Sequence, residues 1–457
     1  MQNHTQALGA SRNQLWLQVV VVLAISTAAF GQKPAPHTGE ADRLVPSEQF
    51  VIIRVYGSIL YSTKHWGGEG ALLAPLTTEQ IDGWMKKCAD NGVTTVLWRA
   101  NCAGTLTYPS KFTGLAGEPP LPDPNEGMGV ASVKQGWALA DWQWLGEQCK
   151  RFNTLEAAVT AAHKHGLKFY LDFNTFDMVG SWCSPKTWPD GGDQNWDPDM
   201  WLWSKDQNRR LAGVPCYFDP KVRARRLAEL AEALEYDLDG VALGFFSHCD
   251  GMSGEDRCAF GYNPVVVSEY KKRHQVDLLT EDVDTHRFYA LHGEGFTEFV
   301  RGASKLVHKK GKKLICSTRT DGIHGWGGST AALATQGETM RWIDLRDGKS
   351  ELPLAAGFYL ETEKWAQERL VDGLLCNAPY TDGVQVVRKL RDRVELPVYL
   401  WRDYTGYQGK VLERPLESFL TEVQEVRNGV MDGYCILVMQ IIDHPNLRPD
   451  WTVVYAK

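Results

Sequence analysis

The sequence predicts an α/β fold, a (β/α)8 TIM barrel with long, decorated strand-to-helix loops. Short apolar runs open just after Gly, Asp or Pro turns, and long polar or aromatic-rich stretches and then helical patterns follow them. The runs are apolar throughout rather than alternating, which is typical of parallel strands buried on both faces. The eight predicted strands are residues 51–56, 93–99, 168–173, 240–245, 313–318, 373–377, 397–402 and 433–439.

The connections differ in length on the two sides of the predicted barrel. Turns that lead into strands are short, and most contain glycine, as at Asn91-Gly92. The loops that leave strands two to five are long and hold most of the Trp, Cys, Asp and His residues. In such a barrel the strand-to-helix loops build the functional site. Beyond the residues that end strand eight, at 440–444, only residues 445–457 remain, so we expect its helix to be short or missing.

The N-terminal segment, residues 1–31, predicts a cleavable signal peptide. An apolar stretch over residues 15–30 is broken by only three polar residues, and the small residues Ala29 and Gly31 suit cleavage after Gly31. The stretch is near the short end for a membrane span, and an uncleaved N-terminal anchor remains the alternative. We expect a secreted or periplasmic protein with no stable membrane span after cleavage.

The remainder of the chain predicts one domain. Residues 32–48 are Pro-rich and polar, as in a linker, and residues 49–457 fit a single barrel with insertions. The chain is 43% hydrophobic, enough for one large core, and its net charge is −7 with no basic block. Because nucleic-acid binding requires positive charge, we expect no nucleic-acid partner.

Nine of the 10 cysteines fall into two groups. Cys316, Cys376 and Cys435 lie within predicted core strands, where a free thiol behaves as a small hydrophobic group. The spacings do not fit a zinc or iron–sulfur motif, so we expect no metal and no cofactor. Export would allow up to three disulfides among the remaining loop cysteines, and we favour Cys249–Cys258 because both lie in one loop. The six loop cysteines are Cys102, Cys149, Cys183, Cys216, Cys249 and Cys258.

Aromatic residues concentrate in the predicted loops. The chain has 17 Trp, and the loop after strand three contains Trp182, Trp188, Trp196, Trp201 and Trp203. Such a cluster either lines a carbohydrate cleft, because flat rings suit the CH face of a sugar, or packs a long loop against the barrel. We favour the cleft for the cluster as a whole.

Polar residues at the predicted strand ends suit a polyhydroxyl ligand, because each hydroxyl group needs hydrogen-bond donors and acceptors. Arginines among them suggest a partly anionic ligand, since guanidinium groups bind carboxylate and sulfate well. By contrast, we interpret Arg223, Arg225 and Arg226 as solvent-exposed residues at the start of the helix after strand three. The substrate-binding candidates are Arg99, Asn101, Asn174, Trp182, His248, Arg319, Asp321, Asn377, Trp401, Arg402 and Gln440.

Three stretches carry a resemblance to a known family: residues 199–206 (DMWLWSKD), 236–241 (YDLDGV) and 357–365 (GFYLETEKW). Together with residues 213–223 and 370–375, they resemble the uncharacterised glycoside hydrolase-like, family 10-like TIM-barrel proteins of planctomycete-type bacteria. The resemblance implies a barrel over most of the chain and a carbohydrate-active function. Those relatives tend to carry an acid at the end of strand four, where this chain has Gly244, so the resemblance also implies that the acid is lost or that Asp250 takes its role.

Aspartates supply the carboxyl groups available at the predicted strand ends. Glycoside hydrolysis normally needs two carboxyl groups that flank the scissile bond. We predict Asp250 and Asp403 as the acid/base pair, with Asp177 as the substitute for either. Asp172 lies inside its strand and is as well explained as a structural partner of Arg99 or Arg54.

Three functions remain open from the sequence. The favoured one is a secreted glycoside hydrolase that acts on a polysaccharide or oligosaccharide. A non-catalytic glycan-binding barrel and a polysaccharide lyase are the alternatives. Strand one lacks the His-x-His pattern of metal-dependent amidohydrolases, and no Gly-rich run suits a phosphate after strands seven and eight. The sequence makes no prediction of oligomeric state.

Overall fold

The structure is a computed structural model. It describes residues 48–54, 75–90, 92–99, 101–102, 105–112, 147–176, 197–244, 260–319, 323–325, 332–333, 341–344, 350–352, 357–377, 383–403, 422, 424–425, 428–429 and 431–438. The predicted signal peptide, almost all of the linker and the predicted short eighth helix lie outside these residues, and so remain predictions.

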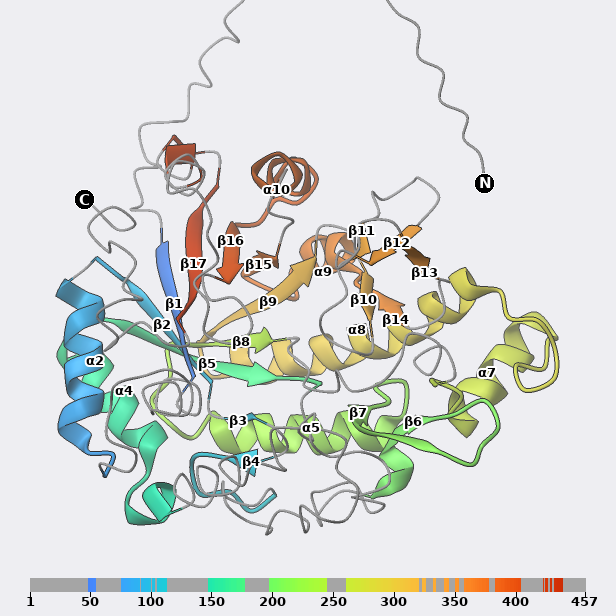
Figure 1. The fold of residues 1–457 in the computed structure, drawn as a ribbon, viewed down its shortest axis with the longest axis horizontal. Coiled ribbons are helices and arrows are strands. Elements are labelled where there is room, and N and C mark those ends of the chain that lie inside the picture. Colours follow the sequence, from blue (N-terminus) through green and yellow to red (C-terminus); the bar gives the residue numbers. More distant parts are fainter. Residues whose placement is uncertain are drawn as a thin grey trace, which may run out of the picture. The chain divides into compact units, whose positions relative to one another are not determined.

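Eight parallel strands close into a barrel, which confirms the predicted fold class (Figure 1). All eight predicted strands are present, with bounds that differ by at most a few residues. In barrel order each strand is hydrogen-bonded to the next, and the last, β2, is paired with the first, β1. The order is β1 (Glu48–Arg54), β17 (Gly433–Val438), β16 (Val398–Asp403), β15 (Gly373–Asn377), β9 (Lys313–Arg319), β8 (Gly240–Gly244), β5 (Lys168–Asn174) and β2 (Thr95–Arg99).

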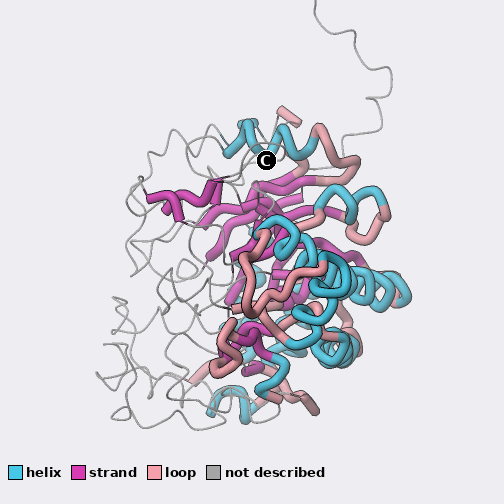
Figure 2. Tube along the Cα trace, turned by 90° about the vertical axis from the view of Figure 1, so that its right-hand side faces the viewer, coloured by secondary structure: helices cyan, strands magenta, loops and turns pink. Residues whose placement is uncertain are grey.

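Helices lie outside the strands, as expected for alternating strand and helix units (Figure 2). Side-chain caps begin several of them: Asn153 accepts a hydrogen bond from the Glu156 amide, and Asp219 and Asp284 cap the two helices that follow them. The helices are α2 (Thr78–Asp90), α4 (Thr154–Lys164), α5 (Pro220–Ala233), α7 (Pro264–His274), α8 (Thr285–Lys309), α9 (Thr362–Gln367) and α10 (Gly383–Arg391).

Small antiparallel sheets decorate the connections between the strands and helices of the barrel. The prediction of long strand-to-helix loops did not include them. They are β3 (Asn101–Cys102) with β4 (Thr105–Leu106), β6 (Trp201–Trp203) with β7 (Arg210–Pro215), β10 (Ile323–Gly325) with β14 (Gly357–Tyr359), and β11 (Ala332–Leu333), β12 (Arg341–Asp344) and β13 (Ser350–Leu352) in one sheet. A three-residue helix, η4 (Pro198–Met200), precedes β6.

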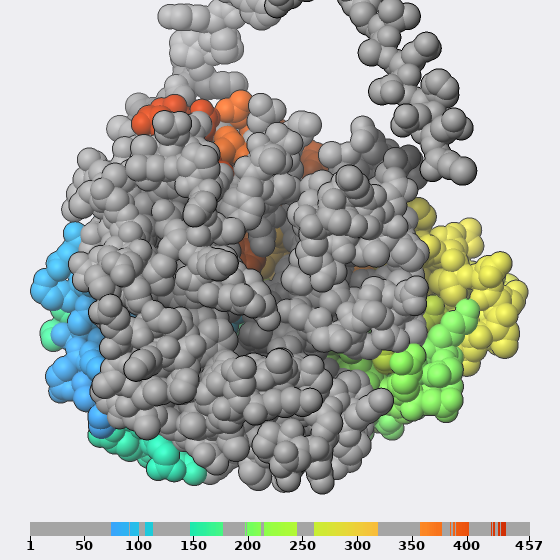
Figure 3. All heavy atoms as spheres, in the orientation of Figure 1, coloured from blue at the N-terminus to red at the C-terminus, as the bar shows by residue number. Residues whose placement is uncertain are grey.

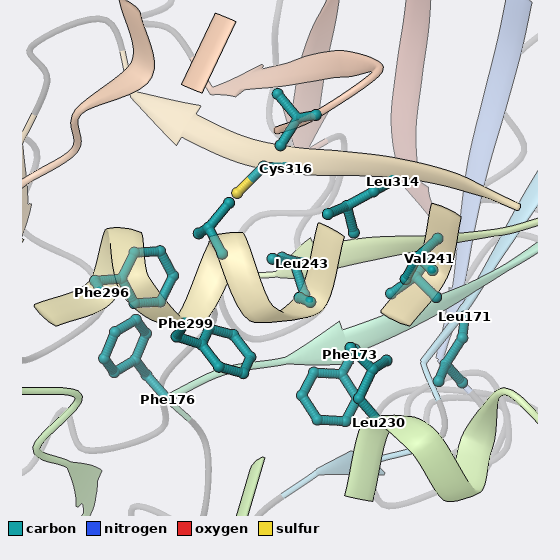
Figure 4. Packing of buried hydrophobic residues seen from close by; sticks show 14 of the residues in the cluster. Leu171, Phe173, Phe176, Leu230, Val241, Leu243, Phe296, Phe299, Leu314 and Cys316 are labelled. Atoms are coloured by element: carbon teal, nitrogen blue, oxygen red, sulfur yellow. The ribbon is translucent and has the colours of Figure 1, made fainter. Parts of the chain in front are cut away.

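The core has two parts. The larger part lies between the strands and the helices, where Phe176 packs against Phe296 of α8 with ring centroids 5.5 Å apart (Figure 4). The smaller part is a neutral cluster inside the barrel, with Trp401 packed against it. We call this the inner cluster; it consists of Leu97, Tyr170, Ala242, Ile315, Leu375, Tyr399 and Cys435.

The cysteine prediction was right for the strands and wrong for two loop positions. Cys316, Cys376 and Cys435 are buried and form no disulfide. Cys149 and Cys216 are also buried and free, because both pack into the apolar core, and burial raises the pKa of each thiol to about 12. The favoured Cys249–Cys258 disulfide lies outside the described residues.

Three aspartates connect neighbouring strands at the N-terminal end of the barrel. Asp239, Asp372 and Asp432 each precede the first glycine of a strand. Each carboxylate accepts a hydrogen bond from a backbone N–H at the start of the adjacent strand. The donor is the second residue of β5 and of β9, and the first residue of β16. The amides are those of Phe169 at 2.8 Å, Leu314 at 2.8 Å and Val398 at 3.0 Å. The aspartate that precedes each of these three strands therefore has the same role, which is to bind the backbone of the neighbouring strand.

The same three carboxylates also bind the helix that leads into the adjacent strand. Cations or histidines near the ends of these helices supply the partners, so each aspartate joins a helix end to two strands. The pairs are His163 Nε2 of α4 to Asp239 at 2.9 Å, His308 Nε2 of α8 to Asp372 at 2.9 Å, and Arg391 Nη2 of α10 to Asp432 at 3.0 Å.

The glycine after each of two aspartates makes room for a tyrosine inside the barrel. A Cβ atom on Gly240 would lie 2.6 Å from the Tyr170 ring, and one on Gly373 would lie 2.8 Å from the Tyr399 ring. Large and small residues thus alternate between adjacent strands, which lets the tyrosine rings fit inside the barrel.

We predict that Asp372→Ala lowers the free energy of unfolding by about 1–3 kcal/mol, because it leaves the Leu314 amide without its carboxylate partner. Burial raises the pKa of Asp372, but the hydrogen bonds from Leu314, His308 and Lys313 outweigh it, so the pKa lies below the ordinary 3.8. The ionised carboxylate therefore stabilises the fold above about pH 4, and this contribution is lost as the pH falls further.

Urea denaturation at several pH values would measure this effect, with the exposed Asp282→Ala as the control. Equal stabilities of the two variants at pH 7 would contradict the role of Asp372.

Candidate functional site

The C-terminal ends of six consecutive barrel strands carry most of the predicted site positions that the structure describes. The strands β2, β5, β8, β9, β15 and β16 follow one another in the barrel. Five of the six end at a predicted site residue and the sixth ends at Gly244. The last residues are Arg99, Asn174, Gly244, Arg319, Asn377 and Asp403. The barrel therefore brings these positions, distant in sequence, to one rim, which we call the mouth.

The other predicted site residues lie elsewhere in β16, in β3, or outside the described part of the chain. Trp401 and Arg402 lie in β16 just before Asp403, and Trp401 is half-buried against the inner cluster. Asn101 lies in β3, opposite Leu106 of β4. The remaining predicted residues lie outside the described part of the chain and stay predictions; they are Asp177, Trp182, His248, Asp250, Asp321 and Gln440.

A buried ion pair lies inside the barrel at the mouth. Arg99 Nε donates to Asp172 Oδ2 over 2.6 Å, and the two side chains are 2% and 3% exposed. The partner of Asp172 is thus Arg99, one of the two predicted from the sequence. Because Asp172 balances the charge of Arg99, this arginine is not an isolated cation for an anionic ligand.

Gly244 makes the ion pair possible. A Cβ atom at this position would overlap Oδ1 of Asp172 and lie 3.4 Å from Nη2 of Arg99. An acidic side chain at residue 244 would therefore displace the pair. The lack of a side chain at Gly244 of β8 and the position of the Asp172 carboxylate of β5 therefore depend on each other.

The ends of β5 and β8 are held together by a set of hydrogen bonds. Both the amide and the hydroxyl of Thr175 donate to the Gly244 carbonyl, over 2.9 Å and 2.7 Å. The Tyr217 hydroxyl donates to the Thr175 carbonyl over 2.8 Å. These bonds give the mouth a rigid backbone on this side.

Arg226 of α5 completes this support, and our interpretation of it as a solvated residue was wrong. Its side chain is 2% exposed, donates to the Asn174 carbonyl over 2.5 Å and pairs with Glu229. The guanidinium also lies 4.2 Å from the centre of the Phe173 ring. Glu229, three residues further along the same helix face, was the sequence signal that Arg226 is paired, although this spacing gives no signal of burial.

The two described tryptophans of the loop after β5 pack rather than line an open surface. Trp201 is 1% exposed, and the Arg210 guanidinium lies 3.2 Å from the centre of the Trp203 ring. Asn263 binds the backbone of both, donating to Trp201 O over 2.7 Å and accepting from Trp203 N over 3.1 Å. The carbohydrate cleft is therefore not supported by these two residues, and for Trp182, Trp188 and Trp196 it remains a prediction.

The β6–β7 hairpin and the segment before α7 lie side by side at one edge of the molecule (Figure 3). The Trp203 carbonyl accepts from Gly261 N over 2.9 Å, and the Gly261 carbonyl accepts from His292 Nε2 of α8 over 2.9 Å. Burial lowers the pKa of His292 to about 4, although its hydrogen bond to Gly261 raises it. At neutral pH the imidazole is therefore uncharged and serves as a structural donor.

Within the described part of the chain, no group of three or more His, Cys, Asp or Glu side chains could hold a metal ion. Among the described helices, none is both long and apolar enough to span a membrane.

Comparison with known proteins indicates the fold and not the family. No family model and no curated protein matches the sequence. Among solved structures, the glycoside hydrolase domain of PgaB (BpsB) from Bordetella bronchiseptica has 12% identity, with 90% of this chain and 100% of that domain covered and a TM-score of 0.50. The catalytic domain of beta-amylase from Paenibacillus polymyxa has 11% identity, coverages of 90% and 98%, and a TM-score of 0.46.

These identities are too low to show more than the fold. The chain has a TIM-barrel fold similar to that of glycoside hydrolase catalytic domains, and it covers the whole PgaB domain. The activity must be argued from the site, because this fold carries many unrelated chemistries.

We predict that Gly244→Ala lowers the free energy of unfolding by about 1–3 kcal/mol, since the added methyl group overlaps the Asp172 carboxylate. Gly83→Ala is the matched control. It lies in the exposed interior of α2 with open space around its Cβ position, and should stabilise the protein by about 0.5–1 kcal/mol. Chemical denaturation measures both, and stabilisation by Gly244→Ala would refute the packing described here.

We also predict that His292 makes stability depend on pH. Its folded pKa, about 4, lies below the ordinary 6.5, so the unfolded chain takes up the proton first as the pH falls. Stability should fall between pH 6.5 and 4, by at most about 3 kcal/mol. His292→Gln keeps a donor for the Gly261 carbonyl and should flatten this slope in denaturation curves; an unchanged slope would show that His292 is not its source.

Proposed function

We propose that this protein is a secreted carbohydrate-active enzyme, a glycoside hydrolase that acts on a polysaccharide or oligosaccharide. One observation supports it most: six consecutive strands end at one mouth, and Arg99, Asn174, Arg319, Asn377 and Asp403 are the last residues of five of them. Residues of these polar types at one rim are what we expect for a ligand with many hydroxyl groups. The similarity of the fold to the PgaB glycoside hydrolase domain agrees with this function.

In the proposed mechanism Asp250 and Asp403 are the two catalytic carboxyl groups, and Asp177 substitutes for either. One would protonate the glycosidic oxygen while the other acts as nucleophile or activates water. Asp403 ends β16, and Asp250 follows β8, three strand positions away around the barrel. Two acids on such separated strands can lie on opposite sides of a bond held in the mouth. A carboxyl separation of about 5–5.5 Å would give retention and about 6.5–9.5 Å inversion.

The resemblance to family 10-like barrel proteins supports the same activity, but this chain differs from them at residue 244, which is glycine. Where those relatives tend to carry an acid, the Arg99–Asp172 pair occupies the available space. Residue 244 itself therefore cannot carry the acid without displacing the pair, and Asp250, in the loop beyond β8, is our candidate for that role. The same observation favours the second candidate function, a glycan-binding barrel without catalysis.

The proposed cellular location follows from the N-terminal sequence. Cleavage after Gly31 would release a protein that begins at Gln32 into the periplasm or the medium. N-terminal sequencing of the exported protein would test this site, and a chain that retains residues 1–31 in the membrane would support the anchor alternative.

We predict that the chain without residues 1–31 releases reducing ends from at least one glycan in a panel of neutral, uronic and sulfated polysaccharides. Asp250→Asn and Asp403→Asn should each lower kcat by about 10²–10⁴-fold with binding retained, because each removes a proton donor or acceptor from the reaction.

Asp282→Asn, at an exposed position before α8, is the control and should keep full activity. Binding without release from any glycan would favour the binding-barrel function. If the protein neither binds nor cleaves any glycan of the panel, both functions are contradicted.

A further inference from the structure

Glu229 of α5 binds two adjacent arginines with its two carboxylate oxygens. Arg225 Nε donates to Oε1 over 2.7 Å, and Arg226 Nη1 donates to Oε2. The spacing explains the arrangement, because residues three and four positions apart are neighbours on a helix surface. The side chains of Glu229 and Arg226 are almost fully buried, and that of Arg225 is 19% exposed. We call these three residues the α5 bridge.

Each arginine of the α5 bridge also binds a backbone carbonyl, and the two carbonyls belong to different strand-to-helix connections. Arg225 Nη2 donates to the Phe112 carbonyl, in the connection that follows β2, and its guanidinium lies 5.1 Å from the centre of the Phe112 ring. Arg226 Nη2 donates to the Asn174 carbonyl at the end of β5, and its guanidinium lies over the Phe173 ring. Because β2 and β5 are neighbours in the barrel, the α5 bridge joins two adjacent connections.

Glu232, one turn further along α5, holds the connection after β2 a second time. Its carboxylate accepts a hydrogen bond from Ser110 Oγ and another, over 2.9 Å, from the Lys111 amide. The Phe112 amide donates to Ser110 Oγ over 3.0 Å, so this segment is fixed next to the residue that Arg225 binds. The segment can therefore be loosened at Glu232 without changing any residue of the α5 bridge.

Burial makes the two arms of the α5 bridge depend on each other. Both arginines bind one carboxylate, so a displacement of either guanidinium acts on the Glu229 side chain that the other one binds. Because Glu229 is almost fully buried, water does not readily replace an arginine that leaves it. Losing a hydrogen bond to a buried charged group is costly, so the two arms should stay formed together and break together.

We propose that the α5 bridge is a conformational coupling device, which transmits a displacement of the connection after β2 to the end of β5 and in the reverse direction. The two connections then become ordered together and open together. Because strand-to-helix connections build the functional site in barrels of this type, a ligand held by one connection would also order the other. The inference goes beyond the proposed function and holds for any ligand of the mouth.

Hydrogen–deuterium exchange of backbone amides measures this coupling without any ligand. The Phe112 amide reports on the connection after β2, and the Thr175 amide, which donates to the Gly244 carbonyl over 2.9 Å, reports on the end of β5. Glu232→Ala removes a carboxylate that holds the first connection and should speed the exchange of Phe112. If the bridge transmits the change, the exchange of Thr175 should also rise, by about threefold or more, although the described hydrogen bonds of Glu232 are to the other connection.

Arg226→Lys provides the comparison that isolates the bridge. One ammonium replaces two guanidinium donors in fork geometry, so it cannot bind Glu229 and Asn174 as the arginine does. In this background Glu232→Ala should no longer change the exchange of Thr175. Thermal denaturation establishes that each variant is folded. If Arg226→Lys is not, the double variant Arg226→Met with Glu229→Leu breaks the bridge in its place, because apolar residues often replace a buried ion pair without loss of stability.

Glu235→Ala is the matched control, because this exposed carboxylate just beyond the end of α5 pairs with Lys310. It should leave the exchange of Phe112 and Thr175 unchanged. Unchanged exchange of Thr175 in Glu232→Ala would overturn the coupling, and so would a change of equal size with and without the bridge. Since no glycan takes part, these outcomes leave the proposed function standing, and failure of the glycan panel would leave this inference untouched.

Discussion

Closure of the parallel sheet is the constraint on which the rest of this structure depends. A parallel strand at an open edge would expose its backbone groups, and β1 removes both edges at once by pairing with β17 and with β2. Closure also forces side chains of alternate residues into a narrow interior. Gly240 and Gly373 are small because Tyr170 and Tyr399 already fill that space.

The two ends of the barrel use charge in different ways. At the N-terminal end, Asp239, Asp372 and Asp432 are partly exposed and bind backbone amides and helix ends, which stabilises the junctions between neighbouring units. At the C-terminal end, the Arg99–Asp172 pair is almost fully buried. The residues that stabilise the junctions thus lie at the N-terminal end of the barrel, and the candidate site lies at the C-terminal end, as in other TIM barrels.

Much of the candidate site follows from the sequence because strand ends are local features. Arg99, Asn377 and Asp403 each follow an apolar run, and parallel strands place their carboxyl ends at the same rim. The burial of Arg226 and the free state of Cys149 and Cys216 were not predictable in this way. They depend on what packs against α5 and the core from distant parts of the chain.

The sequence by itself determined the eight strands, their parallel order and the side of the barrel that carries the polar residues, because strand length, apolar pattern and turn residues are properties of neighbouring positions. Only the tertiary structure decided that Asp172 pairs with Arg99 and that Gly244 makes room for both. These three residues come from three different strands, so their distances are set by barrel closure and register, which no local pattern encodes.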